Sequence, residues 1–264
     1  PSGGKVELLI NRPLDAFRVS VYIRGKMKPG MRLLFERELA AVVEALHADG
    51  SRTVTFEQHG RTLRFEELLP VIDAIGHIPL PPYIQREDNE EDAREYQTVF
   101  AQNEGAVAAP TASLHFTDAL FENICARHPH AFVTLHVGAG TFKPVETEII
   151  TDHPMHSEYF EIPNSTKSLL DSEIPLLCVG TTSTRTVEYY ARTRETGGEA
   201  NLFLHPGNPP LRADHLLTNF HLPKSTLLML VASFVGLEKT HELSAEAIKE
   251  KYRFYSYGDA MLIL

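Results

Sequence analysis

Cysteine is scarce in this chain of 264 residues, which contains only Cys125 and Cys178. Two cysteines are too few for a disulfide framework, and they lack the close spacing of a metal site. We expect both to be ordinary buried thiols of a protein that works in the reducing cytoplasm. Long apolar runs are also missing. A membrane span needs about 20 apolar residues, and the longest run, Leu227 to Val235, is about half that length. The sequence therefore predicts no contact with a membrane.

Three glycine-containing fingerprints of common enzyme classes are absent. There is no G-x-G-x-x-G dinucleotide motif, no complete G-x-x-x-x-G-K-[ST] phosphate loop and no G-x-S-x-G nucleophile elbow. These absences argue against dinucleotide binding, ATP hydrolysis and the serine chemistry of the α/β-hydrolases.

An excess of positive charge is missing as well. The formal net charge of −10 excludes a generally basic nucleic-acid-binding protein. A local basic run nevertheless lies between residues 18 and 37 and includes Arg24, Lys26 and Lys28. From its charge alone, this run is either a solvated face or a local basic surface.

The organisation of the chain changes near residue 75. Residues 1–75 read as short strands separated by turn signals such as Asp-Gly and His-Gly, which predicts a small β-barrel-like domain. A proline-rich connector follows, and strand-like and helix-like segments then alternate. This alternation predicts a layered α/β catalytic domain over residues 76–264 with a largely parallel sheet. Its strand candidates are Ala131–Val137, Leu176–Gly180, Asn201–His205 and Leu211–Thr218.

The most informative segment is Thr218–Thr226, which leads directly into the apolar run 227–235. It places an amide, an imidazole, an ammonium group and hydroxyls at the start of a predicted helix. Pro223 disfavours helix at the residue before it, and Ser225 or Thr226 can cap the helix that follows. Ligands of α/β proteins bind beyond the carboxyl ends of strands, so we predict a ligand site here.

Three other segments have the same character. The first is Leu114–Thr117, and a helical pattern from Asp118 to Arg127 follows it. In the run 134–145, Gly138 and Gly140 allow a ligand to approach the backbone closely. The run Thr181–Arg185 stands at a predicted helix start, where backbone amides, hydroxyls and a guanidinium group suit an anion.

Histidine is abundant, with 13 residues, and two interpretations stay open. In the first, His153, His156 and Glu158 bind a metal ion and His136 or His115 completes the ligand set. The spacing is a weak signal, because a proline between the two histidines opposes a helical arrangement. In the second, the histidines are hydrogen-bonding and proton-transfer groups.

The last thirteen residues, Tyr252–Leu264, contain tyrosines, an arginine and Asp259 beside a glycine. These groups either stack on and hydrogen-bond a nucleobase or form an aromatic patch that closes the core. The sequence leaves both possibilities open.

Several long segments, in order through nearly the whole chain, resemble the S-adenosylmethionine:tRNA ribosyltransferase-isomerase family of queuosine biosynthesis. The segments are AVAAPTASLHFT (106–117), FVTLHVGAGTFKPV (132–145), HPMHSEYF (153–160), VGTTSTRTVE (179–188), LTNFHLPKSTLLMLVASF (217–234) and YRFYSYGDAMLIL (252–264), together with GGKVELLI (3–10), IPLPPYI (78–84) and YQTVFA (96–101). The strand-rich segment that precedes Gly-Gly-Lys in the family is absent, so we expect part of the α/β domain to be missing.

The resemblance implies a small β-barrel inserted in an α/β domain. It also implies that the ribosyl group of S-adenosylmethionine is transferred to 7-aminomethyl-7-deazaguanine at the tRNA wobble position and isomerised. The products are epoxyqueuosine-tRNA, adenine and methionine. S-adenosylmethionine is consumed as a co-substrate, with no prosthetic group and no metal. The implied partners are S-adenosylmethionine and the anticodon loop of tRNA, and we expect a cytoplasmic monomer.

This implied chemistry needs particular groups. The sulfonium acidifies the adjacent ribose carbon, so a base must take a proton there, while departing adenine needs an acid and the methionine carboxylate an amide-rich or cationic pocket. The expected catalytic residues are His136, His156, Glu158 and His221. The expected substrate-binding residues are His115, Gly138, Gly140, Thr182, Ser183, Arg185, Asn219, Lys224, Ser225 and Asp259. The residues expected to contact tRNA are Arg24, Lys26 and Lys28.

Two functions of other classes remain as alternatives. A metal-dependent hydrolase would use His153, His156 and Glu158, and stoichiometric zinc in the protein would support it. A non-catalytic RNA-binding module would use the basic run alone, and release of adenine would exclude it.

Overall fold

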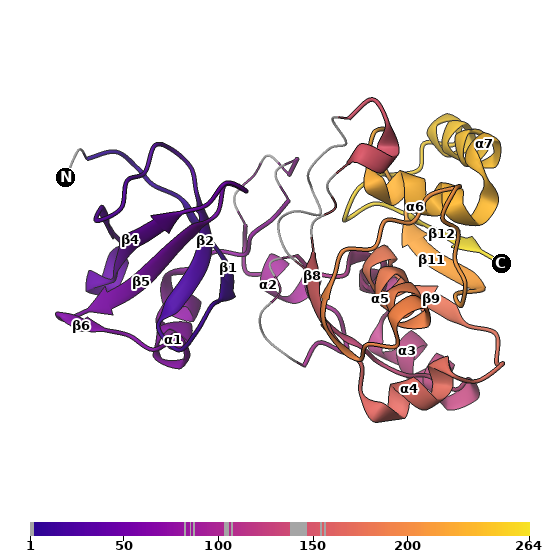
Figure 1. The fold of residues 1–264 in the computed structure, drawn as a ribbon, viewed down its shortest axis with the longest axis horizontal. Helices are drawn as coiled ribbons and strands as arrows, with labels where there is room; N and C mark the ends of the chain where they lie inside the picture. The colour runs from indigo at the N-terminus through magenta and orange to yellow at the C-terminus, as the bar shows by residue number, and fades with distance from the viewer. Residues whose placement is uncertain are drawn as a thin grey trace. The chain divides into compact units, whose positions relative to one another are not determined.

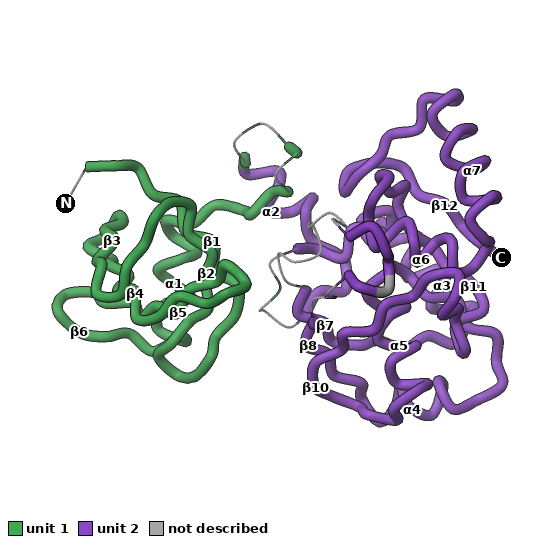
Figure 2. Tube along the Cα trace, turned by 45° about the horizontal axis from the view of Figure 1, so that its top comes forward, with its two compact units in different colours: residues 1–89, 104–107 green, residues 90–103, 108–264 purple. Residues whose placement is uncertain are grey.

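In the computed structural model the chain forms two compact units, coloured separately in Figure 2. Unit 1 contains residues 1–89 and 104–107, and unit 2 contains residues 90–103 and 108–264. The structure describes residues 3–81, 83–84, 86, 88–102, 106, 108–137, 147–153, 155 and 157–264.

Unit 1 is built on a six-stranded antiparallel sheet in the order β1-β2-β5-β4-β3, with β6 paired to β5 (Figure 1). The strands are β1 (Leu8–Pro13), β2 (Arg18–Ile23), β3 (Arg32–Leu34), β4 (Ala40–Leu46), β5 (Arg52–Gln58) and β6 (Arg61–Thr62). Val19 and Val21 of β2 and Val54 of β5 are fully buried, because alternate residues of a strand share one face. The loop His59-Gly60 joins β5 to β6 with φ angles of 51° and 77°, as a type I′ hairpin requires.

The core of unit 1 is closed on one side by helix α1 (Phe65–Ile75), whose Leu68 is buried against the sheet residues. A short 3₁₀ helix, η1 (Glu36–Glu38), joins β3 to β4. The expected closed barrel is not found. In the described part of unit 1, β1 pairs only with β2 and β3 only with β4, whereas closure requires the two edge strands to pair.

Unit 2 contains two three-stranded sheets, β10-β8-β7 and β12-β11-β9. Their strands are β7 (Thr134–His136), β8 (Glu158–Glu161), β9 (Leu177–Val179), β10 (Gly197–Ala200), β11 (His215–Asn219) and β12 (Ala260–Ile263). The pair β9–β11 is parallel, and the other strand pairs described in this unit are antiparallel. The expectation of a largely parallel sheet is therefore corrected. Alternation of strands and helices along the chain does not determine which strands pair, and β10 returns to β8 in the opposite direction.

The expected strand Asn201–His205 is also displaced. The strand β10 ends at Ala200, and the following residues have no regular structure apart from an isolated bridge between His205 and Asn208. The turn-forming sequence His-Pro-Gly-Asn at 205–208 makes the turn that this bridge closes.

The helices of unit 2 are α2 (Asp92–Glu95), η2 (Thr111–His115), α3 (Asp118–Arg127), η4 (Ile150–Asp152), α4 (Asn164–Leu170), α5 (Thr181–Thr193), α6 (Thr226–Val235) and α7 (Leu237–Lys249). The nearly all-apolar α6 lies between the sheet β12-β11-β9 and α7 (Figure 1). Its Leu230 and Val231 share a buried cluster with Leu216 of β11 and Ile263 of β12. Among the described residues, no helix is both long and apolar enough to cross a bilayer.

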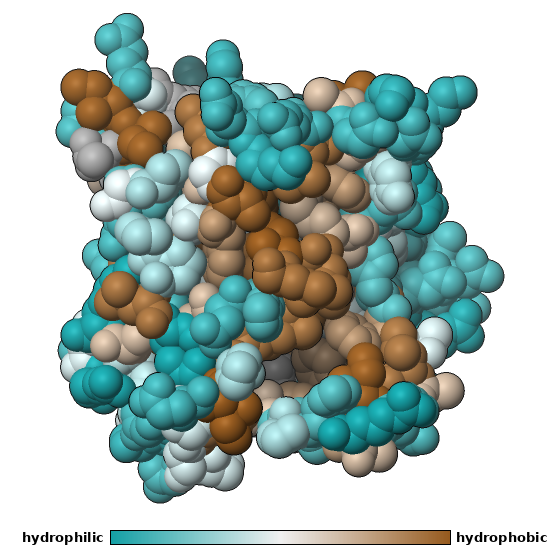
Figure 3. Space-filling view, turned by 90° about the vertical axis from the view of Figure 1, so that its right-hand side faces the viewer, coloured by the Kyte–Doolittle hydropathy of each residue, from teal (hydrophilic) through white to brown (hydrophobic). Residues whose placement is uncertain are grey.

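The two faces of the sheet β12-β11-β9 differ in burial. Cys178 and Leu216 are paired across β9 and β11 and are buried at 4% and 0% exposure. On the opposite face, Leu177 is 42% exposed and Leu262 is 53% exposed. Figure 3 views the molecule from the right-hand side of Figure 1, where β12 lies, and shows a patch of apolar side chains there.

Candidate active site

The parallel strands β9 and β11 bring two of the predicted segments to one edge of their sheet. The amide of Gly180, directly after β9, donates to the carbonyl of Leu217 in β11 at 2.8 Å. Because the two strands are parallel, their carboxyl ends lie side by side. The start of α5 after β9 and His221 after β11 therefore belong to the same edge, where α/β proteins bind ligands.

Asn219, the last residue of β11, is buried at 2% exposure and joins three segments. Its Oδ1 accepts a hydrogen bond from the hydroxyl of Thr111 at 3.0 Å. Its Nδ2 lies 3.3 Å from Nε2 of His115 and 3.5 Å from the carbonyl oxygen of Ser256. The side chain of Asn219 thus ties both η2 and the C-terminal segment to the end of β11.

Several aromatic rings of the C-terminal segment pack against other rings of unit 2. Tyr252 and Phe254 lie against Phe220, with ring centroids 5.3 and 5.4 Å from it. The Tyr257 ring lies 5.6 Å from that of Tyr96. These contacts are typical of aromatic rings that close a core.

Asp259 is held in its ionised form at the same edge. Its carboxylate accepts hydrogen bonds from the guanidinium of Arg253 at 3.1 Å and from the Arg253 backbone amide at 2.7 Å. These hydrogen bonds lower the pKa of Asp259, whose carboxylate also interacts electrostatically with His115. Asp259 is therefore an acceptor within electrostatic reach of His115.

His221 is half-buried just beyond β11, and its Nε2 lies 2.7 Å from the hydroxyl of Thr218. Burial lowers the pKa of this imidazole to about 4. His221 is consequently neutral at physiological pH, which is the protonation state that a proton acceptor needs.

Two helix starts stand at this edge. The helix α5 begins after Gly180, whose φ is 92°, and in the described chain no side chain caps the first-turn amides of Thr182 and Ser183. These amides and the positive end of the helix dipole suit an anion. At α6, Ser225 is the N-cap and accepts from the Leu228 amide at 3.1 Å, which confirms the predicted cap. Lys224 before it is exposed, with a positive φ of 59°.

Glu158 and Arg185 form a buried ion pair between β8 and α5. The Arg185 Nη1 donates to Oε2 of Glu158 at 2.9 Å, and its Nε donates to the carbonyl of Leu202 at 3.0 Å. Both residues are buried, with exposures of 4% and 6%. The guanidinium predicted to bind an anion is thus engaged by a carboxylate of the chain itself.

His136 occupies the other face of the same sheet. It is paired with Tyr159 across β7 and β8, and the two rings stack at 5.4 Å. Adjacent residues of a strand point to opposite faces, so His136 and Glu158 do not face each other. Burial lowers the pKa of His136, with partial opposition from Glu161. Its Nδ1 is buried without a hydrogen-bond partner in the described structure.

The metal-site interpretation finds no support in the structure as far as it is described. No group of three or more histidine, cysteine, aspartate or glutamate side chains within the described ranges is placed to hold a metal ion. The His153 ring packs edge-on against Phe203 at 6.1 Å, and Glu158 is paired with Arg185. Three predicted site residues, Gly138, Gly140 and His156, lie outside the described residues.

The basic run forms an exposed surface in unit 1. Arg24, Lys26 and Lys28 are all exposed. Other arginines of this unit are paired, as Arg32 is with Glu57 at 2.8 Å and Arg61 with Glu67 at 2.7 Å. None of the ion pairs found among the described residues involves the three cations of the run.

Glu188 is a structural residue to which the sequence assigned no role. It is fully buried in α5, and its carboxylate accepts from the backbone amides of Leu211, Arg212 and Ala213 at 2.7–2.8 Å. It thereby fixes the segment that leads into β11 and the site edge. The sequence offered no clear signal, because α5 is rich in threonine and arginine and its burial is visible only in the structure.

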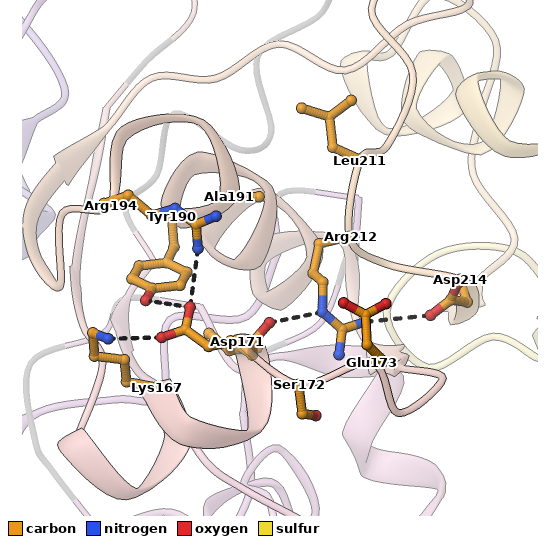
Figure 4. Close-up of a pocket in the computed structure, with 11 residues that line it drawn as sticks. Lys167, Asp171, Ser172, Glu173, Tyr190, Ala191, Arg194, Leu211, Arg212 and Asp214 are labelled. Carbon is orange, nitrogen blue, oxygen red and sulfur yellow. Dashed lines mark hydrogen bonds and ion pairs between the residues drawn. The ribbon is translucent and has the colours of Figure 1, made fainter.

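The hollow in Figure 4 lies elsewhere, between α4, the C-terminal end of α5 and the segment 211–214. Its charged groups neutralise one another. Asp171 accepts from Lys167 at 2.7 Å, from the Tyr190 hydroxyl at 2.8 Å and from Arg194 at 2.9 Å. None of the predicted site residues lines it, so the edge of β9 and β11 remains the candidate active site.

Comparison with known proteins gives matches along the whole chain. Residues 1–263 match the family model described as queuosine biosynthesis protein. The chain is 65% identical over 264 residues to the S-adenosylmethionine:tRNA ribosyltransferase-isomerase of Sulfurimonas denitrificans, and 61% identical over 263 residues to that of Nitratiruptor sp.. Each alignment covers 100% of this chain and 77% of the relative.

A solved structure is also similar. The crystal structure of S-adenosylmethionine tRNA ribosyltransferase from Thermotoga maritima is 30% identical, with a TM-score of 0.48, over 99% of this chain and 75% of that chain. From the family match and the identities to the curated relatives, the chain belongs to the S-adenosylmethionine:tRNA ribosyltransferase-isomerase family of queuosine biosynthesis proteins.

Proposed function

We propose that this chain transfers the ribosyl group of S-adenosylmethionine to 7-aminomethyl-7-deazaguanine at the tRNA wobble position and isomerises it. The products are epoxyqueuosine-tRNA, adenine and methionine. The observation that carries this proposal is the 65% identity to a ribosyltransferase-isomerase over the full chain. The metal-dependent hydrolase has no comparable support.

The edge of β9 and β11 supports this reaction with groups of the required kinds. The uncapped amides of Thr182 and Ser183 at the start of α5 suit the methionine carboxylate. Asp259, ionised beside Arg253, suits an ammonium or hydroxyl donor of the substrate. His221, kept neutral by burial, is a candidate to take the proton from the ribose carbon next to the sulfonium.

Other residues of the predicted site have different roles in this proposal. Glu158 and Arg185 act together as a buried pair that fixes β8 against α5. His136 is a second neutral imidazole, on the opposite face of β8 from that pair. Lys224 is an exposed cation at the start of α6, where it can meet an anionic group.

The basic run of unit 1 is our candidate for the tRNA contact. Arg24, Lys26 and Lys28 are exposed, and phosphate groups are the ligands that clustered arginine and lysine side chains favour. We further propose that the chain acts on the anticodon loop, as a monomer and in the cytoplasm.

The direct test is release of adenine from S-adenosylmethionine. The chain is incubated with S-adenosylmethionine and either tRNA that carries the 7-aminomethyl-7-deazaguanine base or the same tRNA with guanine at that position. We expect adenine, methionine and ribosylated tRNA in equal amounts with the first tRNA and none with the second. Binding of both substrates without adenine release would contradict the proposed reaction and leave RNA binding as the function.

A further inference from the structure

The contact between Asn219 and His115 defines which ring nitrogen of an accessible imidazole carries the proton. Asn219 is buried at 2% exposure, whereas His115, at the end of η2, is exposed. The hydroxyl of Thr111 and the carbonyl of Ser256 bind the two ends of the Asn219 amide at 3.0 and 3.5 Å. An accessible imidazole is thus held at one nitrogen by a buried group.

The orientation of the Asn219 amide follows from its partners. A carbonyl oxygen can only accept a hydrogen bond, so the group that faces Ser256 is Nδ2. The same Nδ2 faces Nε2 of His115 at 3.3 Å. Because Nδ2 donates, Nε2 must accept, and the proton of the neutral ring lies on Nδ1. Protonation of Nε2 would set two N–H groups against each other.

The carboxylate of Asp259 is within electrostatic reach of His115. Its two oxygens are, however, engaged by the backbone amide and the guanidinium of Arg253 at 2.7 and 3.1 Å. Thr111 on η2 and Ser256 on the C-terminal segment are neutral. The direct amide contact therefore determines which nitrogen of His115 carries the proton.

We propose that Asn219 is a positioning residue that fixes the neutral form of the His115 imidazole in the tautomer with its proton on Nδ1. His115 is then a catalytic residue whose Nδ1–H donates a hydrogen bond to a substrate acceptor on which negative charge develops, such as a ring nitrogen of departing adenine. A neutral donor of this kind stabilises developing charge without itself transferring a proton. This inference rests on the proposed ribosyl transfer for its catalytic part, and on the structure alone for the tautomer.

The tautomer is tested by nitrogen NMR of protein labelled at the histidine ring nitrogens. The His115 signals are assigned by their loss in His115→Gln. For the neutral ring we expect a protonated Nδ1 and an unprotonated Nε2. A proton on Nε2 in the unmodified protein would overturn the inference. This measurement does not depend on turnover, so it decides the tautomer even where no adenine is released and the proposed function fails.

The role in turnover is tested with Asn219→Asp and the pH profile of adenine release. The new carboxylate accepts from Nε2–H, so the neutral ring of the variant keeps its proton on Nε2 and Nδ1 has no hydrogen to donate. Adenine release by the variant should therefore fall as the pH rises to 8.5, by at least about tenfold relative to the unmodified protein. Asn208→Asp, which places the same change beside Arg192, should leave the profile in place.

A folded Asn219→Asp protein with an unmoved profile would overturn the catalytic part. Where that variant does not fold, Thr111→Val gives a second test, because it removes the hydroxyl that holds Oδ1 of Asn219. We expect it to lower kcat and to give mixed His115 tautomers. Unchanged kcat with a single tautomer would contradict the positioning role.

Discussion

At the scale of single residues, burial determines what a charged side chain contributes, and the pair Glu158–Arg185 shows this most directly. Both groups are buried, and Glu158→Gln removes the carboxylate charge that the Arg185 guanidinium contacts. Loss of one partner of a buried pair costs about 3–5 kcal/mol. We expect a loss of that size in the free energy of unfolding in urea.

Two further variants serve as controls for this prediction. Glu173→Gln, at an exposed glutamate, should change the unfolding free energy by less than about 0.5 kcal/mol. The double substitution Glu158→Gln with Arg185→Met should recover much of the loss, because it also removes the buried charge that Glu158 faces. A single variant as stable as the unmodified chain would show that the pair is not buried in solution.

His221 carries a prediction for the dependence of stability on pH. Its pKa is about 4 in the folded chain and about 6.5 when unfolded. Between these values the unfolded chain binds a proton that the folded chain does not, so stability falls as pH decreases through this range. This loss of unfolding free energy amounts to roughly 2 kcal/mol between pH 7.5 and pH 5.

Urea unfolding of His221→Gln beside the unmodified chain separates the contribution of His221 from the contributions of the other histidines. Relative to His221→Gln, the unmodified chain should lose about 2 kcal/mol of unfolding free energy when the pH falls from 7.5 to 5. Parallel pH dependences of the two proteins would refute the shifted pKa of His221.

Single residues also show which contacts of the site can be predicted from sequence. Ser225 was predicted as a helix cap and is one, because a cap depends on residues within one turn. The contacts of Asn219 with Thr111 and His115 join residues 108 and 104 positions apart. No local pattern encodes such a contact, so Asn219 was expected to bind substrate directly, and its hydrogen bonds to the chain itself were not foreseen.

At the scale of elements, the hydrogen bonds of Glu188 indicate that α5 holds the segment that leads into β11 in place. Glu188→Gln replaces one carboxylate oxygen by an NH₂ group, which cannot accept from the amides of segment 211–213. We expect hydrogen exchange at these amides to accelerate by at least about tenfold. Glu195→Gln, at an exposed glutamate just after the same helix, should leave exchange unchanged. Equal exchange in both variants would contradict this role of Glu188.

Elements also differ in how far sequence determines them. The alternation in β2 and β5 of unit 1 was visible in sequence, because their apolar residues stand mainly at every second position. The direction of pairing was not, because β8 meets β10 only after α4, β9 and α5 have intervened. The helix α6 was recognised from its apolar run, yet a short apolar run does not reveal the neighbours that bury it.

At the scale of the whole molecule, a net charge of −10 must be reconciled with a polyanionic substrate. Exposed cations concentrated in one region can bind phosphates while the rest of the surface repels them. Arg24, Lys26 and Lys28 of unit 1 meet this description. Neutralising Lys26 and Lys28 to glutamine should therefore weaken tRNA binding and flatten the plot of log Kd against log salt by about 1–2 in slope.

The control for this prediction removes the same total charge elsewhere. Lys239 and Lys249 of α7 are exposed lysines, 2.8 and 3.0 Å from Glu242 and Glu246. Their double substitution by glutamine should leave the salt slope unchanged, although it makes the molecule more acidic by the same amount. Equal weakening by both double variants would mean that tRNA responds to net charge alone. Only a smaller slope confined to the Lys26 and Lys28 variant locates phosphate contacts in unit 1, since counterions are released only where a lysine meets a phosphate.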